Sequence, residues 1–266
     1  MTEREYRQHE GISRSELWKL RESPEKAKYA WEHPEPPTPA LLFGQAVHKL
    51  LLEPETFDDE FVVSEKFDKR TKAGKEAYNA FCEGLGDRSV ITPDQYQTAV
   101  EMRNKAISEP FVSKLLQGEH EKPIHWVDEL TGETCKIRMD VLSEIDGRPL
   151  IVDYKTAEDA STDAFMRAAI KHGYDFQAAM YSEGVEKTTG QKPIFVFIAQ
   201  EKKPPYSVNI LQADELFIKH GYDIFRELLG IYHECKTSGN WYGYLGAYNI
   251  INNLALPSWA AKELES

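Results

Sequence analysis

The stretch Ile151-Val152-Asp153-Tyr154-Lys155-Thr156 begins with apolar residues and then alternates a carboxylate with an ammonium. An apolar start of this kind indicates a short buried strand. Because side chains alternate along a strand, Asp153 and Lys155 are expected on the same side of it. Thirteen residues earlier, Asp140 follows an apolar-patterned segment. Two acidic strand positions and a lysine, joined by a tight turn, suggest metal-dependent phosphodiester cleavage, although the tripeptide alone is more often a surface ion pair.

The composition is that of an ordinary globular protein. The chain has 266 residues, 41% of them hydrophobic and 29% charged, and we expect a single domain over residues 1–266. No apolar run approaches the roughly 20 residues of a membrane span, and residues 1–5 contain no apolar signal core. The three cysteines are far apart and form no C-x-x-C pair, which argues against a disulfide framework. A cytoplasmic protein without a membrane segment is expected.

The net charge of −12 argues against non-specific nucleic-acid binding through overall charge. It does not exclude a DNA enzyme, because metal-binding carboxylates add negative charge and a local basic stripe is enough to contact phosphates. One such stripe runs from Lys66 to Lys75 and includes Arg70 and Lys72. A solvated loop leading into a helix explains the same residues, and the sequence leaves both interpretations open.

Cap and turn signals divide the chain into helices, a β-meander, and then further helices and strands. Helices are expected to begin at Ser13 and Ser23 and to cover about 40–53, 92–108, 162–173, 175–188 and 214–235. Strands are expected over 124–127, 134–142, 150–154, 193–199 and 205–211. This order indicates an α/β fold with a mixed sheet.

Two of the expected helices carry further candidate residues. His48 interrupts the apolar face of the helix over 40–53, and Gly44 before it allows another backbone to come close. A histidine in that position is by itself more often a satisfied core residue than a ligand. Gln177 and Tyr181 lie four residues apart and therefore share one helix face. Alone, that pair is a weak signal.

Taken together, the four elements resemble the motifs of the PD-(D/E)xK nuclease superfamily, in the branch of RecB-type and lambda-exonuclease-like enzymes. That branch has a Gly-x-x-x-His helix, an aspartate, an Asp-x-Lys and a Gln-x-x-x-Tyr helix, in this order. Closer still is the similarity to nuclease domains of the exonuclease VIII type, which runs from about residue 10 to 262. It includes Gly11-Ile12-Ser13-Arg14-Ser15, Leu52-Glu53-Pro54-Glu55 and Leu256-Pro257-Ser258-Trp259-Ala260. The resemblance implies a restriction-endonuclease-like core, with a mixed central β-sheet flanked by helices, and an N-terminal helical elaboration.

The resemblance also implies a metal site. Asp140, Asp153 and His48, with the carbonyl oxygen of Tyr154, would hold Mg²⁺, and Mn²⁺ would also support activity. Tyr154 stands where relatives have a small or aliphatic residue, but only its carbonyl is expected at the metal. Lys155 would orient the attacking water or stabilise charge on the phosphate.

Further roles follow from the same resemblance. Gln177 would act in catalysis by positioning Lys155 or the phosphate. Ser13, Arg14 and Ser15 would bind a 5′-phosphate, with simple N-capping as the favoured alternative for Ser13. The other expected DNA contacts are Arg70, Lys72, Lys75, Arg138 and Tyr181.

The activity implied is a metal-dependent 5′→3′ exonuclease that releases 5′-phosphomonoesters from linear double-stranded DNA and leaves a 3′ single-stranded tail. The implied partners are DNA ends and a RecT-like single-strand annealing protein, in phage or prophage recombination. The implied assembly is a ring-shaped homotetramer. Two alternatives stay open: an endonuclease or an exonuclease of other polarity, and a non-catalytic DNA-binding module. The module would be indicated by loss of Asp140, Asp153 or Lys155, and none is lost.

Overall fold

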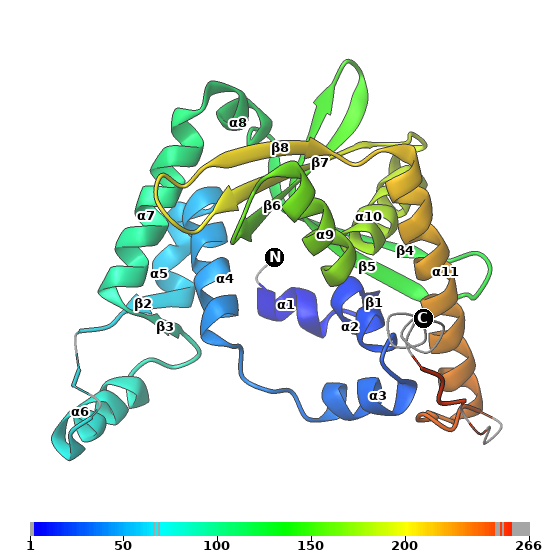
Figure 1. The fold of residues 1–266 in the computed structure, drawn as a ribbon, viewed down its shortest axis with the longest axis horizontal. Coiled ribbons are helices and arrows are strands. Elements are labelled where there is room, and N and C mark those ends of the chain that lie inside the picture. The colour runs from blue at the N-terminus through cyan, green and yellow to red at the C-terminus, as the bar shows by residue number, and fades with distance from the viewer. Residues whose placement is uncertain (1–2, 66, 69, 248–250, 252, 257–266) are drawn as a thin grey trace, which may run out of the picture.

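Figure 1 shows a computed structural model of the chain, which describes residues 3–65, 67–68, 70–247, 251 and 253–256. The end of the expected C-terminal similarity, residues 257–260, lies outside the described residues. In the described part, no helix combines the length and the apolar character needed to cross a membrane. The three cysteines are free thiols.

A mixed sheet lies at the centre of the molecule (Figure 1). Among the described residues its strands are β1 (Ile12–Ser13), β4 (Glu119–Val127), β5 (Thr134–Ile145), β6 (Arg148–Ala157), β7 (Ile194–Glu201) and β8 (Val208–Gln212). Their order is β1-β5-β6-β7-β8, and β4 also pairs with β5. The β1–β5 and β6–β7 pairs are parallel, whereas the β4–β5, β5–β6 and β7–β8 pairs are antiparallel. The predicted mixed sheet is confirmed.

Helices pack on both faces of this sheet. One face is covered by α4 (Pro39–Leu52), α7 (Pro93–Ser108) and α8 (Pro110–Leu115), and the other by α9 (Thr162–His172), α10 (Tyr174–Thr189) and α11 (Glu215–Ser238). The N-terminal elaboration consists of α1 (Glu3–Gln8), α2 (Arg14–Lys19) and α3 (Pro24–Glu32). Between α4 and α7 lie η1 (Pro54–Thr56), α5 (Phe57–Glu60), α6 (Lys72–Glu83) and the parallel pair β2 (Phe61–Val63) and β3 (Ser89–Ile91).

Most helix starts follow from local chemistry. The Ser13 hydroxyl and the Glu16 carboxylate form a capping box at the start of α2, as expected for a serine N-cap. Between α9 and α10, Gly173 has φ +66, and a Cβ there would collide with the ring of Trp18. The chain therefore needs glycine at this corner, which brings α10 back across the sheet.

Three sequence expectations need correction. The strands of the meander are longer than expected, because β4 begins at Glu119 and β6 continues to Ala157. The strand expected from Pro205 begins at Val208, since neither Pro204 nor Pro205 has an N–H to donate to the sheet. Helix α1 was not expected as an element, whereas α6 agrees with the loop leading into a helix that the sequence left open for residues 66–75.

Two apolar cores lie on opposite faces of the sheet, and β5 takes part in both. Met139 packs with the residues of α9, α10 and α11, whereas Val141 packs with those of α4, α7 and α8. The strand therefore passes from one core to the other at Asp140. The same residue stands where β5 leaves β1 and begins to pair with β6.

Candidate metal centre and active site

Asp153 and Lys155 lie together on β6, between β5 and β7. The Asp153 side chain is only 1% exposed, and its Oδ2 lies 2.5 Å from Nζ of Lys155. Their partners on the parallel strand β7 are Phe197 and Ala199, so that side of the pair is apolar. The predicted same-side arrangement is confirmed, and the pair is buried rather than a surface ion pair.

Burial and neighbouring carboxylates determine the charge of this pair. Burial raises the pKa of Asp153, and the Asp140 charge raises it further against the opposing effect of Lys155. Burial alone would lower the pKa of Lys155, but the charges of Asp153 and Asp140 outweigh it and raise that pKa. Lys155 is therefore an ammonium at neutral pH. A divalent cation beside the carboxylates would favour their ionised forms.

Asp140, Tyr154 and His48 meet at one point between β5, β6 and α4. The main-chain N–H of Tyr154 donates to Oδ2 of Asp140 at 2.7 Å. Nε2 of His48 lies 2.6 Å from the Tyr154 carbonyl oxygen, and its Nδ1 lies 3.6 Å from Oδ2 of Asp140. Three of the four expected metal ligands thus converge. The close backbone approach expected at Gly44 is not found, because the nearest atom to a Cβ placed there is Oγ1 of Thr156, at 3.7 Å.

Glu121 joins this group and was missed by the sequence reading. The register of β4 and β5 pairs His120 with Val141 and Lys122 with Met139, which places Glu121 opposite Asp140. Like charges placed directly opposite on antiparallel strands repel. The sequence signal was weak because the strand was expected to begin three residues later, at Ile124.

Ligand atoms of His48, Glu121 and Asp140 all lie within 4.8 Å of one another. Two carboxylates and one imidazole nitrogen match the preferences of Mg²⁺ and Mn²⁺ for hard donors, with the nitrogen favouring Mn²⁺. Asp153 is not in this tightest group, because its carboxylate is turned toward Lys155 and Gln177. Its role as a ligand stays a prediction.

Two side chains of α10 contact the buried pair, Gln177 at Asp153 and Tyr174 at Lys155. Nε2 of Gln177 donates a hydrogen bond to Oδ1 of Asp153. Gln177 therefore orients this carboxylate, which pairs with Lys155, whereas it was expected to position Lys155 or the phosphate directly. One turn further along, Tyr181 is half-buried, and burial raises its pKa, with Tyr6 and Asp153 adding to the effect. The Lys155 ammonium lies 5.1 Å from the ring centroid of Tyr174, a contact that the sequence did not indicate.

The expected 5′-phosphate residues have other contacts in this structure. Ser13 is used as the cap of α2, and its hydroxyl lies 3.3 Å from that of Ser15, which is exposed. The Arg14 guanidinium donates to the carbonyl oxygens of His172 and Gly173, at the C-terminal end of α9. The guanidinium is therefore already hydrogen-bonded to the C-terminal end of a helix, where positive charge is favoured.

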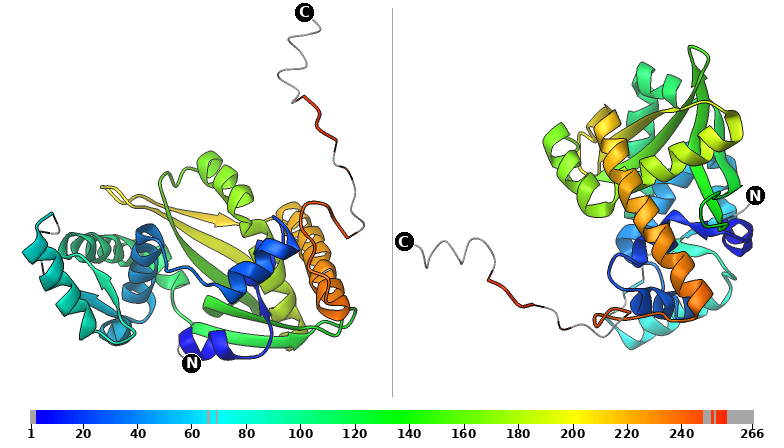
Figure 2. Two further views of the ribbon diagram at one scale, coloured as in Figure 1. Left: turned by 90° about the horizontal axis from the view of Figure 1, so that it is seen from below. Right: turned by 90° about the vertical axis from the view of Figure 1, so that its right-hand side faces the viewer.

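The remaining expected DNA contacts fall into two places. Arg138 lies on β5 two residues before Asp140, and its Nε is 2.7 Å from Oε2 of Glu121. Arg70, Lys72 and Lys75 are exposed in and before the first turn of α6. Helix α6 stands away from β5 and β6 in Figure 1 and in the left view of Figure 2. The structure thus brings Arg138 to the metal group but not the other three.

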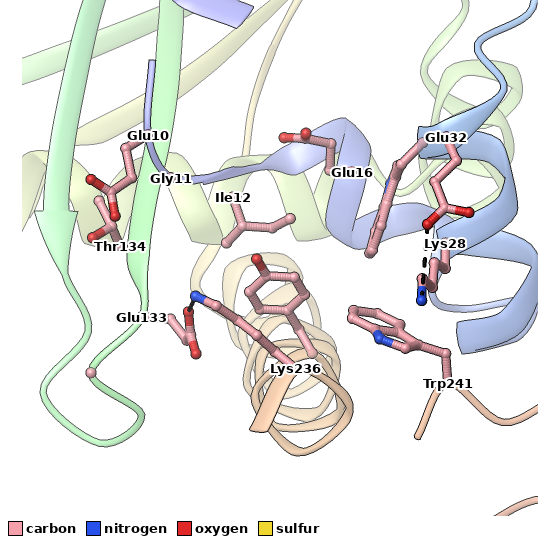
Figure 3. A pocket seen from close by; sticks show the side chains of 13 residues that line it. Glu10, Gly11, Ile12, Glu16, Lys28, Glu32, Glu133, Thr134, Lys236 and Trp241 are labelled. Atoms are coloured by element: carbon pink, nitrogen blue, oxygen red, sulfur yellow. Dashed lines mark hydrogen bonds and ion pairs between the residues drawn. The ribbon is translucent and has the colours of Figure 1, made fainter. Parts of the chain in front are cut away.

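A separate cavity of about 420 Å³ lies between α3, α11 and the β4–β5 turn. Figure 3 shows Lys236 of α11 reaching Glu133 of the β4–β5 turn, and Lys28 paired with Glu32 along α3. Its aromatic wall includes Trp241. None of His48, Asp140, Asp153 and Lys155 lines this cavity, so the catalytic candidates lie elsewhere.

The model of the family DUF3799, described as a PDDEXK-like domain of unknown function, matches residues 13–253. The chain belongs to this family. The DUF3799 match covers His48, Asp140, the Asp153–Lys155 pair and Gln177. The family and the site together support a nuclease that uses a divalent metal.

One solved structure shares the fold of the chain. The crystal structure of a protein named "Putative exonuclease", from Eubacterium rectale, has a TM-score of 0.65 and 18% identity over 98% of this chain and 97% of its own. At that identity the likeness shows the fold alone. The structure of SSO0001 has a TM-score of 0.33 and 12% identity, over 70% of this chain and 85% of its own, and no conclusion follows from it. No curated protein matches the chain.

Proposed function

We propose that this DUF3799 protein is a metal-dependent 5′→3′ exonuclease of the exonuclease VIII type. It degrades one strand of linear double-stranded DNA, releases 5′-phosphomonoesters and leaves a 3′ single-stranded tail. The observation that carries the proposal is the meeting of Asp140, the Tyr154 carbonyl and His48 beside the buried Asp153–Lys155 pair.

The donors supplied by this site are suited to Mg²⁺, and Mn²⁺ is expected to replace it. When bound, the cation polarises the scissile phosphate and lowers the pKa of a water. His48, Glu121 and Asp140 would hold it, with Asp153 and the Tyr154 carbonyl as further ligands. A divalent cation fits this site for two reasons. The donors are mostly hard oxygen atoms, and a cation would relieve the repulsion between the facing carboxylates of Glu121 and Asp140.

The protein residues around that position have separate tasks. Lys155 keeps its positive charge and would orient the attacking water or stabilise the negative charge that develops on the phosphate. Gln177 holds the Asp153 carboxylate, which in turn holds Lys155. Tyr181 braces α10 or contacts the DNA backbone.

We propose residues for binding the DNA end from the family resemblance and from the exposure of their side chains. Ser15 is exposed beside the cap of α2 and is the residue we propose for the 5′-phosphate, while Ser13 and Arg14 support it. Arg70, Lys72 and Lys75 would contact the duplex away from the metal. A ring-shaped homotetramer that encircles DNA would focus positive potential inside while its outside stays acidic.

The biological setting is also part of the proposal. A 3′ tail is the substrate of a single-strand annealing protein, and we propose a RecT-like partner in cytoplasmic phage or prophage recombination. No observation on the described residues favours an endonuclease over this activity.

The test uses linear duplexes labelled at either end, with and without a 5′-phosphate, and a covalently closed circle. We expect Mg²⁺-dependent release of mononucleotides from 5′-phosphorylated ends, loss of cleavage in EDTA, and no cleavage of the circle. Cutting of the circle would identify an endonuclease. Release from the 3′-label first would reverse the polarity, and binding without cleavage in either metal would leave only a DNA-binding module.

A further inference from the structure

Helix α1 is attached to β5 by a buried lysine. Nζ of Lys136, whose side chain is almost fully buried, donates to the carbonyl oxygens of His9 at 2.6 Å and Tyr6 at 3.2 Å. These carbonyls belong to the last turn of α1 and the residue after it, where helix carbonyls run out of intrahelical partners, although the Tyr6 carbonyl also accepts from the N–H of His9 at 3.3 Å. A buried ammonium is costly unless it is hydrogen-bonded. The contact therefore fixes α1 against the sheet, beside β4 and β5 (Figure 2).

This attachment places the Tyr6 ring next to the metal group. The Arg138 guanidinium carbon lies 5.3 Å from the Tyr6 ring centroid, and Nζ of Lys136 lies 5.4 Å from it. Arg138 comes two residues before Asp140 on β5, a distance of about 7 Å along a strand. Its side chain is 21% exposed and pairs with Glu121, one of the three grouped ligands. Tyr6 thus lies at the edge of the candidate active site.

A second observation connects Tyr6 with the same site from the side of α10. The Tyr6 phenol is near enough to Tyr181 to add to the rise in its pKa that burial produces, alongside Asp153 and Asp140. Tyr6 and Tyr181 therefore approach the site from different elements. Tyr6 precedes the residues that the DUF3799 model matches, 13–253.

An aromatic ring beside a guanidinium is suited to a single-stranded nucleotide, because the base stacks on the ring and the guanidinium bonds the phosphate. We propose that Tyr6 is a nucleotide-contacting residue, whose ring stacks on the base next to the scissile phosphate while Arg138 contacts the adjoining backbone. This assignment rests on the proposed nuclease function. Helix α1 is then one wall of the path that the cleaved strand follows to the metal.

The test pairs a protein change with a substrate change. Tyr6→Ala and wild type are assayed in Mg²⁺ on 5′-phosphorylated duplexes that carry one abasic site, moved through the terminal nucleotides of the cleaved strand. For one position, the wild type should lose kcat/KM by about 5- to 150-fold, the range of one base–aromatic stack. Tyr6→Ala should lose a similar amount on the intact duplex and nothing further on that abasic duplex. Such non-additivity is the signature of a direct contact.

Two variants separate contact from packing. Tyr6→Phe keeps the ring and should retain near-normal kcat/KM. Tyr29→Ala removes a 63% exposed tyrosine from α3 and should change neither kinetics nor the abasic pattern. Thermal unfolding checks that Tyr6→Ala is folded.

Several outcomes overturn the proposal. Independent losses from Tyr6→Ala and from the abasic site at every position would make Tyr6 a packing residue. Faster cleavage by Tyr6→Ala would show that α1 obstructs the site. A wild type that cleaves no duplex in Mg²⁺ or Mn²⁺ would instead overturn the nuclease function itself, and the Tyr6 assignment with it.

Discussion

The main-chain N–H of Tyr154 donates a 2.7 Å hydrogen bond to the Asp140 carboxylate, so the residue between Asp153 and Lys155 is tied to the other aspartate of the site. The same residue offers its carbonyl oxygen to His48 at 2.6 Å. Strands β5 and β6 and helix α4 are thereby connected through one peptide unit. The geometry of the metal ligands depends on the backbone of β6 as much as on the ligand side chains.

Asp140→Asn and Asp153→Asn are each expected to lower the cleavage rate by at least about 1000-fold, which corresponds to about 4 kcal/mol of transition-state stabilisation. Asp140→Asn should stay folded, because it relieves repulsion with Glu121, and Asp153→Asn keeps an amide oxygen that can still accept a hydrogen bond from Lys155. Mn²⁺ at 100 times its Kd should stabilise the wild type by about 2.7 kcal/mol and these variants much less, as measured by thermal unfolding. Asp146→Asn, in the turn between the two, is the control. Near-normal turnover in either site variant would refute the metal assignment.

Lys155→Met is expected to reduce the single-turnover rate by about 100- to 1000-fold, the effect of removing one preorganised charge-stabilising group. DNA affinity, measured by fluorescence anisotropy with Ca²⁺ in place of Mg²⁺, should change far less. Lys202→Met removes a lysine that pairs with exposed Glu158 and is the matched control. Equal losses in rate and affinity would mean that Lys155 serves binding rather than chemistry.

Glu121→Gln is expected to weaken Mn²⁺ binding by about 10- to 100-fold, as for loss of a residue that supports a metal site. The readout is isothermal titration calorimetry, which does not depend on activity. Glu119→Gln, on the same strand and paired with Lys122 at 2.6 Å, should bind Mn²⁺ normally. Unchanged affinity in Glu121→Gln would show that this glutamate serves only Arg138.

Tyr154→Phe is expected to cost about 1–3 kcal/mol of unfolding free energy, because it leaves Oε1 of the buried Gln200 without its 2.5 Å donor. Cleavage should fall with it, since the Tyr154 peptide loses an anchor. Tyr206→Phe removes a hydroxyl that donates to exposed Glu101 and should be close to neutral in chemical denaturation. A neutral Tyr154→Phe would contradict the anchoring role.

Asp128 is expected to make stability depend on acid pH. Its burial would raise its pKa, but hydrogen bonds from Arg226 and Thr131 outweigh this and lower the pKa to about 2. A carboxylate whose pKa is lower in the folded than in the unfolded protein stabilises the folded state at any pH above its unfolded pKa, which is about 3.9. This stabilisation is about 2 kcal/mol, and it is lost as the pH falls from about 4 to about 2. Asp128→Asn should therefore have a lower free energy of unfolding than the wild type at pH 7. It should lose less of that free energy when the pH is lowered. Glu129→Gln, in the exposed pair with Lys187, should behave like the wild type. The same acid dependence in Asp128→Asn and wild type would contradict this.

Local patterns were enough for much of the fold. The same-side position of Asp153 and Lys155 follows from alternation along a single strand, which needs no tertiary information. Likewise, the Ser13 cap and the stop of α4 before Pro54 are local effects. The order of the four motif elements indicated a PD-(D/E)xK nuclease, and the match to the PDDEXK-like family DUF3799 supports that superfamily.

Short-range patterns and contacts between distant segments decided different features of this protein. The sequence by itself determined the mixed α/β fold and the identity of the residues that meet at Tyr154, because strand alternation, caps and motif order are short-range. Only the tertiary structure decided that Glu121 faces Asp140, that Gln177 holds Asp153, and that α1 brings Tyr6 to Arg138. Register and side-chain partners are set by pairing and packing across many residues, and a shift of one residue in β4 would have turned Glu121 away from the site.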